Sequence, residues 1–186
     1  MKSINRFLFA MYLITWPSTH MLLAQSFYTE AGNVVFISRA PLLEFEGKSN
    51  HLTGIIDFTT DLLDFYLDLN TLDTGIDLRN RHMRESYLET SKYPFAEFTG
   101  TFVPKIDWTI NTPQKVEANG KFTIHGVSNN IQIMGSVTTV NNNEVIIEAE
   151  WTVLLSDYNI RIPRVVFYEL SEVQTVKIIA RMIRRD

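Results

Sequence analysis

Apolar and polar residues alternate along most of this chain, and no other feature of the sequence constrains its fold as strongly. Successive side chains of a β-strand point to opposite faces of a sheet, so a period of two predicts a strand with one buried face. The clearest run spans residues 144–153, where Val145, Ile147, Ala149 and Trp151 alternate with mostly polar neighbours. The same alternation occurs over residues 34–38, 52–58, 63–69, 96–103, 115–124, 131–133 and 175–182. These runs predict eight or nine strands.

The connections between the predicted strands are mostly short, which is typical of an antiparallel sandwich or barrel. The strands are long and follow one another in sequential order, and only one connection is long enough to hold a helix. Both features favour the barrel, because closure removes the exposed edge strands that a sandwich leaves. We therefore predict an all-β fold, an antiparallel β-barrel with one short helix inserted between strands, and keep the sandwich as the alternative.

The first residues of the chain have the pattern of a secretory signal peptide. Two basic residues precede an apolar run over residues 7–14, and Ala24 supplies a small residue at the cleavage position. A membrane anchor is the rival interpretation, but residues 16–20 interrupt the apolar run well short of the roughly 20 residues that a span needs. We predict a signal peptide over residues 1–24, cleaved near Ala24, no stable membrane span, and a single periplasmic or secreted domain over residues 25–186.

Composition excludes several classes of function. The chain has no cysteine, which excludes disulfides, thiolate catalysis, cysteine-ligated metals and a lipoprotein anchor. Residues 25–186 hold 15 basic and 21 acidic residues, a net charge of −6, so nucleic acid is a poor partner. GxSxG, P-loop and Rossmann glycine patterns are absent as well. We predict that the protein is not an enzyme and uses no metal or cofactor.

One connection is unusually long, and long connections in compact domains are commonly functional. It lies within the stretch Thr71–Phe102, whose last residues belong to the predicted strand over residues 96–103, and it begins with the turn Asp73-Thr74-Gly75. A helix is predicted over residues 77–88 with Asp77 as its N-cap. Met83, Tyr87 and Leu88 fall on one side of this helix, and this seam would dock it on the barrel, as a fixed plug or as a moving lid.

Two blocks of the sequence, in order, resemble the central motifs of the YceI-like family. The first block contains Thr71-Leu72-Asp73-Thr74-Gly75, Arg79-Asn80-Arg81-His82-Met83, Tyr87-Leu88, Tyr93-Pro94, Phe98 and Gly100, and the second is Gly120-Lys121-Phe122-Thr123-Ile124-His125-Gly126-Val127. The resemblance covers about residues 33 to 183. The chain departs from the family pattern at Asn80, where aspartate is frequent, at Met83, where leucine is frequent, and at Ile37-Ser38-Arg39, which lacks the usual His-Ser pair.

This resemblance implies an eight-stranded, lipocalin-like antiparallel barrel that is exported and binds a long amphiphile, a polyisoprenoid in particular, in its interior. On this basis we expect an exported lipid-binding protein that transports, stores or sequesters a polyisoprenoid or other long-chain lipid. A homodimer is compatible with the sequence. Two other functions stay open: a redox accessory or enzyme that acts on a quinone-like ligand through His82 or His125, and a ligand-free envelope protein that acts through protein contacts.

The candidate ligand-binding residues are apolar residues on the inward faces of the predicted strands. An apolar interior supplies roughly 0.8 kcal/mol per buried methylene, so no polar motif is needed to hold a tail. The candidates are Phe65, Leu67, Phe122, Ile124, Ile131, Ile133, Val145, Ile147 and Trp151. They could equally be the packed core of a barrel filled by its own side chains.

Three polar residues are candidates for contacts with a headgroup at the rim of the barrel: Arg79, His82 and His125. The simpler interpretation gives both histidines a structural role, because no HxH or HExxH spacing supports a metal or an acid–base pair. Likewise, Arg79 is more simply explained by a pair with Asp73 or Asp77 that holds the turn.

Overall fold

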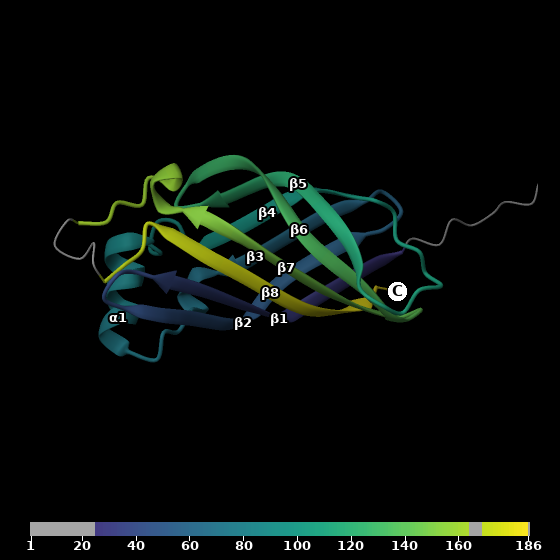
Figure 1. Ribbon diagram of the computed structural model, residues 1–186, viewed down its shortest axis with the longest axis horizontal. Helices are drawn as coiled ribbons and strands as arrows, with labels where there is room; N and C mark the ends of the chain where they lie inside the picture. Colours follow the sequence, from purple (N-terminus) through teal and green to yellow (C-terminus); the bar gives the residue numbers. More distant parts are fainter. Residues whose placement is uncertain (1–24, 164–168, 186) are drawn as a thin grey trace, which may run out of the picture.

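The computed structural model describes residues 25–163 and 169–185, and the predicted signal peptide lies outside these residues. Eight antiparallel strands form a closed barrel in sequential order, in which β8 pairs with β1 (Figure 1). The strands are β1 (Ser26–Arg39), β2 (Glu44–Asp57), β3 (Leu62–Asp68), β4 (Phe95–Val103), β5 (Gln114–Ile124), β6 (Val127–Asn141), β7 (Glu144–Leu154) and β8 (Val173–Arg184). The predicted eight-stranded barrel is therefore confirmed, and the sandwich is wrong.

Several strands are much longer than the apolar alternation indicates. β6 has 15 residues, whereas the sequence shows alternation only around residues 131–133. Its remaining positions are largely Ser, Asn, Thr and Gly, which pair through the backbone without leaving an apolar pattern. β1 likewise begins at Ser26 rather than near Val34, because register shifts on both sides of Gly32 break the alternation.

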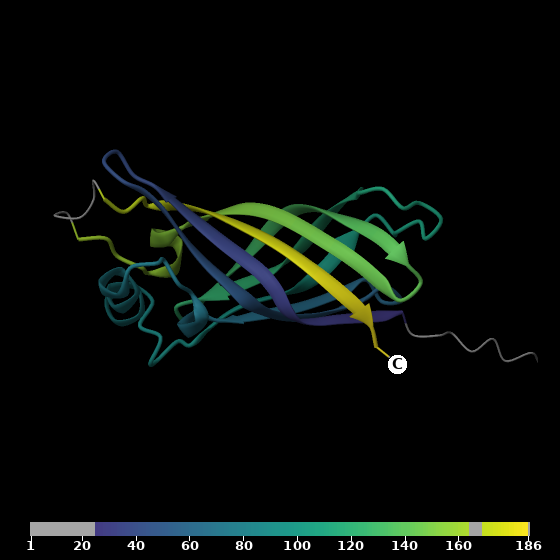
Figure 2. The same cartoon turned by 90° about the horizontal axis from the view of Figure 1, so that it is seen from below.

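The barrel has two different ends, which we call the helical end and the terminal end (Figure 2). The helical end carries the connections that follow β1, β3, β5 and β7, including every helix of the described residues. The terminal end carries the other connections and the first and last described residues, where the amide of Arg185 donates to the carbonyl of Ser26 at 2.8 Å.

Large aromatic side chains fill the terminal end. Phe27 stacks on Trp108 with ring centroids 5.6 Å apart, and Phe58 lies edge-on to Phe27, Phe102 and Trp108 at 5.0–5.5 Å. Trp108 comes from the loop between β4 and β5, which folds back over this end. These four residues, which we call the aromatic cluster, close the barrel at the terminal end.

The predicted helix is present but differs in detail. α1 (Asp77–His82) continues directly into a turn of π-helix, η2 (Met83–Tyr87), so the helical segment matches the predicted span. The predicted N-cap is wrong: Ile76 occupies that position in an extended conformation and makes no side-chain cap, while Asp77 is the first helical residue. There its carboxylate still complements the positive end of the helix dipole.

Two short 3₁₀ helices complete the helical end. They are η1 (Leu69–Thr71), which leads from β3 toward α1, and η3 (Leu155–Tyr158), which follows β7.

Strands β4 and β5 approach each other most closely at two facing glycines. Gly100 and Gly120 are register partners, and a Cβ on either residue would lie 2.7 Å from the Cα of the other. A Cβ on Gly120 would also lie 2.8 Å from the ring of Phe98, a residue on the inner face. The tight coiling of the barrel at this point therefore requires both residues to be glycine.

We predict that Gly120→Ala lowers the free energy of unfolding by about 1–3 kcal/mol, the usual cost of overpacking. Chemical denaturation measures the change. Thr101→Ala, on the exposed outer face of β4, is the matched control and should change stability by less than about 0.5 kcal/mol. Equal stability of Gly120→Ala and the parent protein would show that β4 and β5 are less tightly apposed than described.

Candidate functional site: an apolar cavity inside the barrel

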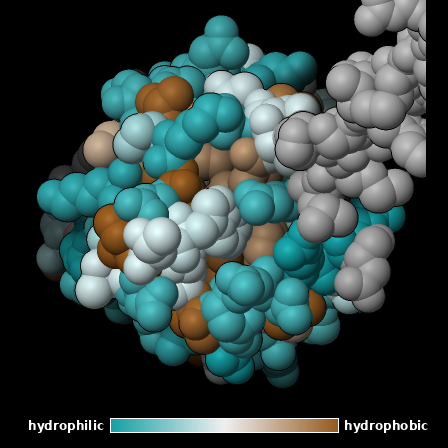
Figure 3. All heavy atoms as spheres, turned by 90° about the vertical axis from the view of Figure 1, so that its right-hand side faces the viewer, coloured by the Kyte–Doolittle hydropathy of each residue, from teal (hydrophilic) through white to brown (hydrophobic). Residues whose placement is uncertain are grey.

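A cavity of about 590 Å³ occupies the barrel interior, within the size range of small-molecule pockets. Phe58 and Phe102 of the aromatic cluster form its floor, and Leu43, Ile76 and Leu78 line it at the helical end. Its walls are almost entirely apolar. The face of the terminal end is mainly hydrophilic, with hydrophobic residues visible as scattered spots between the hydrophilic ones (Figure 3).

The structure places most of the predicted lining residues on the cavity wall. Seven of the nine line it, namely Phe65, Leu67, Phe122, Ile124, Ile133, Ile147 and Trp151. Ile131 instead packs against the edge of the hydrophobic core, and Val145 is fully buried with no exposed surface. Val145 pairs with Met182, which is also fully buried, near the terminal end of β7 and β8. The barrel is thus filled by side chains at one end and hollow toward the other.

Part of the wall comes from residues that the strand pattern did not single out. Met83, Tyr87 and Leu88, the apolar seam of the helical segment, line the cavity, and so does Phe45. The seam was visible in the sequence, but its contact with a cavity was not. Phe45 was missed because β2 begins eight residues before the predicted strand, in a stretch rich in polar residues.

Arg79 and His82 line the cavity at the helical end, where both stay candidates for headgroup contacts, but neither forms the structural contact that the sequence suggested. The Arg79 guanidinium lies 4.3 Å from the centre of the Phe45 ring, a cation–π contact. The expected ion pair with Asp73 or Asp77 is absent, because Asp73 is engaged by other groups. His82 is exposed and has no hydrogen-bond partner among the described residues.

His125 lies outside the cavity wall and holds two other connections of the helical end together. Its Nδ1 donates to the carbonyl of Tyr158 at 3.0 Å, and its Nε2 is 3.2 Å from a carboxylate oxygen of Glu89. The ring packs edge-on against Tyr93 at 4.8 Å. These contacts bring the segment after η2 and the end of η3 against the turn between β5 and β6, so they give His125 a structural role.

The backbone explains why a histidine and a glycine are adjacent in this turn. His125 and Gly126 have positive φ angles of 54° and 72°, as both central residues of a type I′ hairpin turn require. Glycine adopts such angles without strain, and histidine is among the non-glycine residues enriched there.

A group of three residues, the Asn80 clasp, fixes the helix over the helical end. The amide and hydroxyl of Thr74 both donate to Asn80 Oδ1, at 2.8 and 2.7 Å, and Asn80 Nδ2 donates to Asp73 Oδ1 at 2.6 Å. The hydrogen bond from Asn80 holds the pKa of Asp73 below its usual value, with help from the amide of Gly75. Two backbone hydrogen bonds between Asp73 and Lys48 join the clasp to β2.

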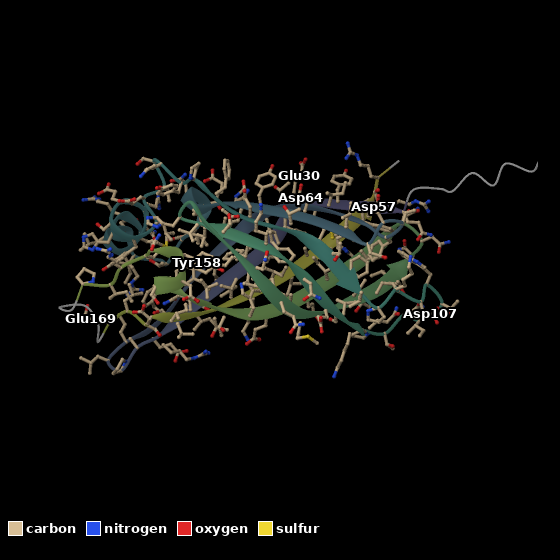
Figure 4. All side chains as sticks on the ribbon, turned by 90° about the horizontal axis from the view of Figure 1, so that it is seen from above. Glu30, Asp57, Asp64, Asp107, Tyr158 and Glu169 are labelled. Atoms are coloured by element: carbon tan, nitrogen blue, oxygen red, sulfur yellow. The ribbon has the colours of Figure 1, made fainter. Side chains whose placement is uncertain are left out.

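Acidic and phenolic groups also border the helical end. Glu169 lies there, far from Asp107 at the terminal end (Figure 4). Burial raises the pKa of Tyr87, and the negative charge of Glu169 raises it further. Tyr87 is therefore a neutral hydroxyl near neutral pH.

The described residues contain no group of three or more His, Asp or Glu side chains placed to hold a metal ion. Within the same residues, no helix has the length and apolar character needed to cross a bilayer.

Comparisons with known proteins agree with this architecture. The family model described as YceI-like domain matches residues 27–182. No curated protein sequence matches the chain. The solved structures described next share only 16–19% sequence identity with this chain, so their similarity shows the fold alone.

Three solved structures illustrate the similarity. A polyisoprenoid binding domain from Saccharophagus degradans implicated in plant cell wall breakdown has a TM-score of 0.74 and 18% identity, over 87% of this chain and 99% of that one. BcnA of Burkholderia cenocepacia has a TM-score of 0.67 and 16% identity, over 83% of this chain and 96% of its own. A YceI protein of Campylobacter jejuni has a TM-score of 0.61 and 19% identity, over 75% of this chain and 85% of its own.

We predict that Asn80→Ala lowers Tm by roughly 2–8 °C, because it leaves the half-buried amide of Thr74 without its acceptor and frees α1 from the turn. Differential scanning calorimetry measures the shift. Asn130→Ala, an exposed asparagine of β6, is the control and should leave Tm unchanged within about 1 °C.

The same pair of proteins tests the pH dependence of the clasp. The pKa of Asp73 lies below the value of 3.8 expected for the unfolded chain, so its contribution is present above that pH. The contribution is lost as the pH falls through the lower pKa of the folded state. The difference in Tm between the parent protein and Asn80→Ala should therefore narrow below about pH 4. A difference independent of pH would show that Asp73 takes no part in the clasp.

Proposed function

This chain belongs to the YceI-like domain family, and on that basis we propose that it binds a long amphiphile, a polyisoprenoid or a lipid of similar shape, with the tail inside the barrel. The observation that carries the proposal is the apolar cavity of about 590 Å³. The structural neighbour described as a polyisoprenoid binding domain supports the ligand class.

The cavity volume sets the length of tail that the barrel accommodates. If a methylene-sized group takes about 30 Å³, the share of a water molecule in the liquid, the cavity holds on the order of 20 such groups. At about 0.8 kcal/mol each, they supply about 16 kcal/mol of gross burial energy. Ordering the tail and associating the two molecules consume much of this. A tail of about 40 carbon atoms would fill the cavity and extend past the rim.

The closed terminal end supports one orientation of the ligand. The aromatic cluster blocks the barrel there, whereas Arg79, His82 and Glu169, three of the polar residues that line the cavity, come from the helical end. An amphiphile bound tail-first through the helical end keeps its polar group near these side chains.

The structure favours this function over the two alternatives. A ligand-free protein acting through contacts alone has no need of an open apolar cavity, and a filled barrel would be more stable. A redox or enzymatic role for His125 is disfavoured because its ring nitrogens face Tyr158 and Glu89, away from the cavity, so that alternative rests on His82 alone, which lines the cavity. Export and carriage across an aqueous compartment follow from the predicted signal peptide and are part of the proposal.

The first test identifies the ligand and measures the preference for tail length. The protein is purified from its native host, and the extracted lipids are analysed by mass spectrometry. Affinity is then measured for prenyl and alkyl amphiphiles of increasing length. We expect affinity to rise by up to about fourfold per methylene and to level off near 20 carbon atoms. Recovery of no lipid, together with no measurable affinity for any member of the series, would refute the proposal.

A second test narrows the cavity itself. Ala118 lines the cavity from β5, so Ala118→Trp fills part of the space and should reduce affinity for a tail of about 20 carbon atoms by at least about tenfold. Lys121→Trp adds the same ring to the outer face of β5 and should bind normally. Ala149→Trp, from β7, repeats the test if Ala118→Trp fails to fold. Unchanged binding in a folded variant would place the ligand outside the barrel.

A further inference from the structure

Two polar atoms in residues of the cavity wall are buried without a hydrogen-bond partner. The indole Nε1 of Trp151 is a donor, and the side-chain Oε1 of Gln174 is an acceptor. Neither atom has a partner among the residues that the structure describes. Buried polar groups in native proteins are nearly always paired, so each exception needs an explanation.

The two residues are neighbours on the inner face of the barrel, close to the helical end. Trp151 faces Val176 in the register of β7 and β8, and Val153 faces Gln174, so Trp151 and Gln174 are diagonal neighbours across the two strands. Diagonal pairs of this kind lie roughly 7–8 Å apart, a spacing within reach of an aromatic and a long side chain. Gln174 is the second residue of β8, so the pair lies just inside the helical end.

The hydrogen bonds of Gln174 fix which of its atoms is free. Its Nε2 donates to the carbonyl of Ser171 at 2.5 Å and to the hydroxyl of Ser38 at 3.3 Å. Rotating the amide by 180° would place its oxygen against the carbonyl oxygen of Ser171, which is repulsive. Ser38 is itself fully buried and also accepts from the amide of Ser171 at 3.0 Å, so this arrangement is anchored.

Trp151 is held less tightly. Its indole packs edge-on against Phe122 at 6.0 Å, and the residue is only partly buried although Nε1 itself is buried, so a turn of the side chain is what brings Nε1 toward a ligand. Residues of the cavity wall therefore hold one unpaired acceptor and one unpaired donor, on neighbouring strands, in surroundings that are otherwise apolar.

We propose that Trp151 and Gln174 recognise a hydroxyl group, so that the preferred ligand is a long-chain alcohol bound with its hydroxyl just inside the helical end. This inference rests on the proposed function, because it concerns the polar end of the same ligand. A hydroxyl accepts from Trp151 and donates to Gln174 at once. A carbonyl or ether pairs with Trp151 alone, and a hydrocarbon pairs with neither.

A carboxylic acid fits this site only in its protonated form. Above its pKa it has no proton to donate to Gln174, and its charge is disfavoured in an apolar wall. The groups that face the helical end include the negative Glu169 and the neutral Tyr87, which do not favour an anion, and the positive Arg79.

Three probes of one carbon skeleton test the proposal: a prenyl alcohol of about 20 carbon atoms, its methyl ether and the corresponding hydrocarbon. We expect the alcohol to bind at least about tenfold more tightly than the hydrocarbon, with the ether between them. Trp151→Phe and Gln174→Met should each reduce the affinity for the alcohol toward that for the hydrocarbon. Ile178→Val, which changes another lining residue without removing a polar atom, is the matched control.

The outcomes separate this inference from the proposed function. If none of the three probes binds, both are wrong. If all three bind equally tightly, the cavity holds a tail but the wall does not select a hydroxyl, and the inference is overturned. It is also overturned if both variants keep the preference for the alcohol. Because Gln174→Met also removes the anchor to Ser38, its Tm is measured as well, and Trp151→Phe decides the matter if Gln174→Met is unstable.

Discussion

Closure of the sheet by β8 against β1 is the constraint on which the remaining structure depends. It pairs every strand on both sides and directs the inward side chains of all eight strands at one axis. A barrel of eight strands is just wide enough either to be filled by these side chains or to hold one small ligand. In this chain the barrel is filled by side chains at the terminal end and hollow toward the helical end. The sizes of the inward residues decide which of the two occurs at each end.

At the terminal end the inward positions carry phenylalanine and methionine, and Trp108 is added from a loop, so the apolar cavity ends at these side chains. Along the cavity, alanines at positions 96, 118 and 149 take inward positions on β4, β5 and β7, and Gly135 does so on β6. Small residues at inward positions of several strands leave a volume that the larger neighbours do not fill. The cavity is thus encoded by the distribution of small residues across strands that are far apart in sequence.

This distribution explains what the sequence could and could not predict. The period of two depends only on which face a residue occupies, so it predicted the strands and the inward orientation of Ile147 and Val145 equally well. It could not show that Ile147 borders open space and Val145 does not, because that depends on the register of neighbouring strands and on a loop that supplies Trp108. Strand ends were underestimated where serine and asparagine pair through the backbone alone.

The polar residues of the helical segment show a second limit. Arg79 was expected to pair with an aspartate because it lies near two of them in sequence. In three dimensions the side chain of Asp73 is occupied by Asn80 and Gly75, and Phe45, from a different strand, offers an aromatic face instead. The sequence showed that the chain departs from the family pattern at Asn80. Only the geometry of the turn showed that the Asn80 side chain both accepts and donates hydrogen bonds.

The same contacts bear on whether α1 and η2 form a moving lid. Met83 and Leu88 are buried, and the clasp adds hydrogen bonds from Asn80, Thr74 and Lys48 to the turn. Swinging the helix away would expose the apolar seam and break all of these contacts together. By contrast, Ile76 and Leu78 line the cavity while about half of each side chain is exposed to solvent. A tail can therefore reach the interior past these two residues while the helix stays in place. On this argument the helical segment is a fixed part of the cavity wall and not a moving lid.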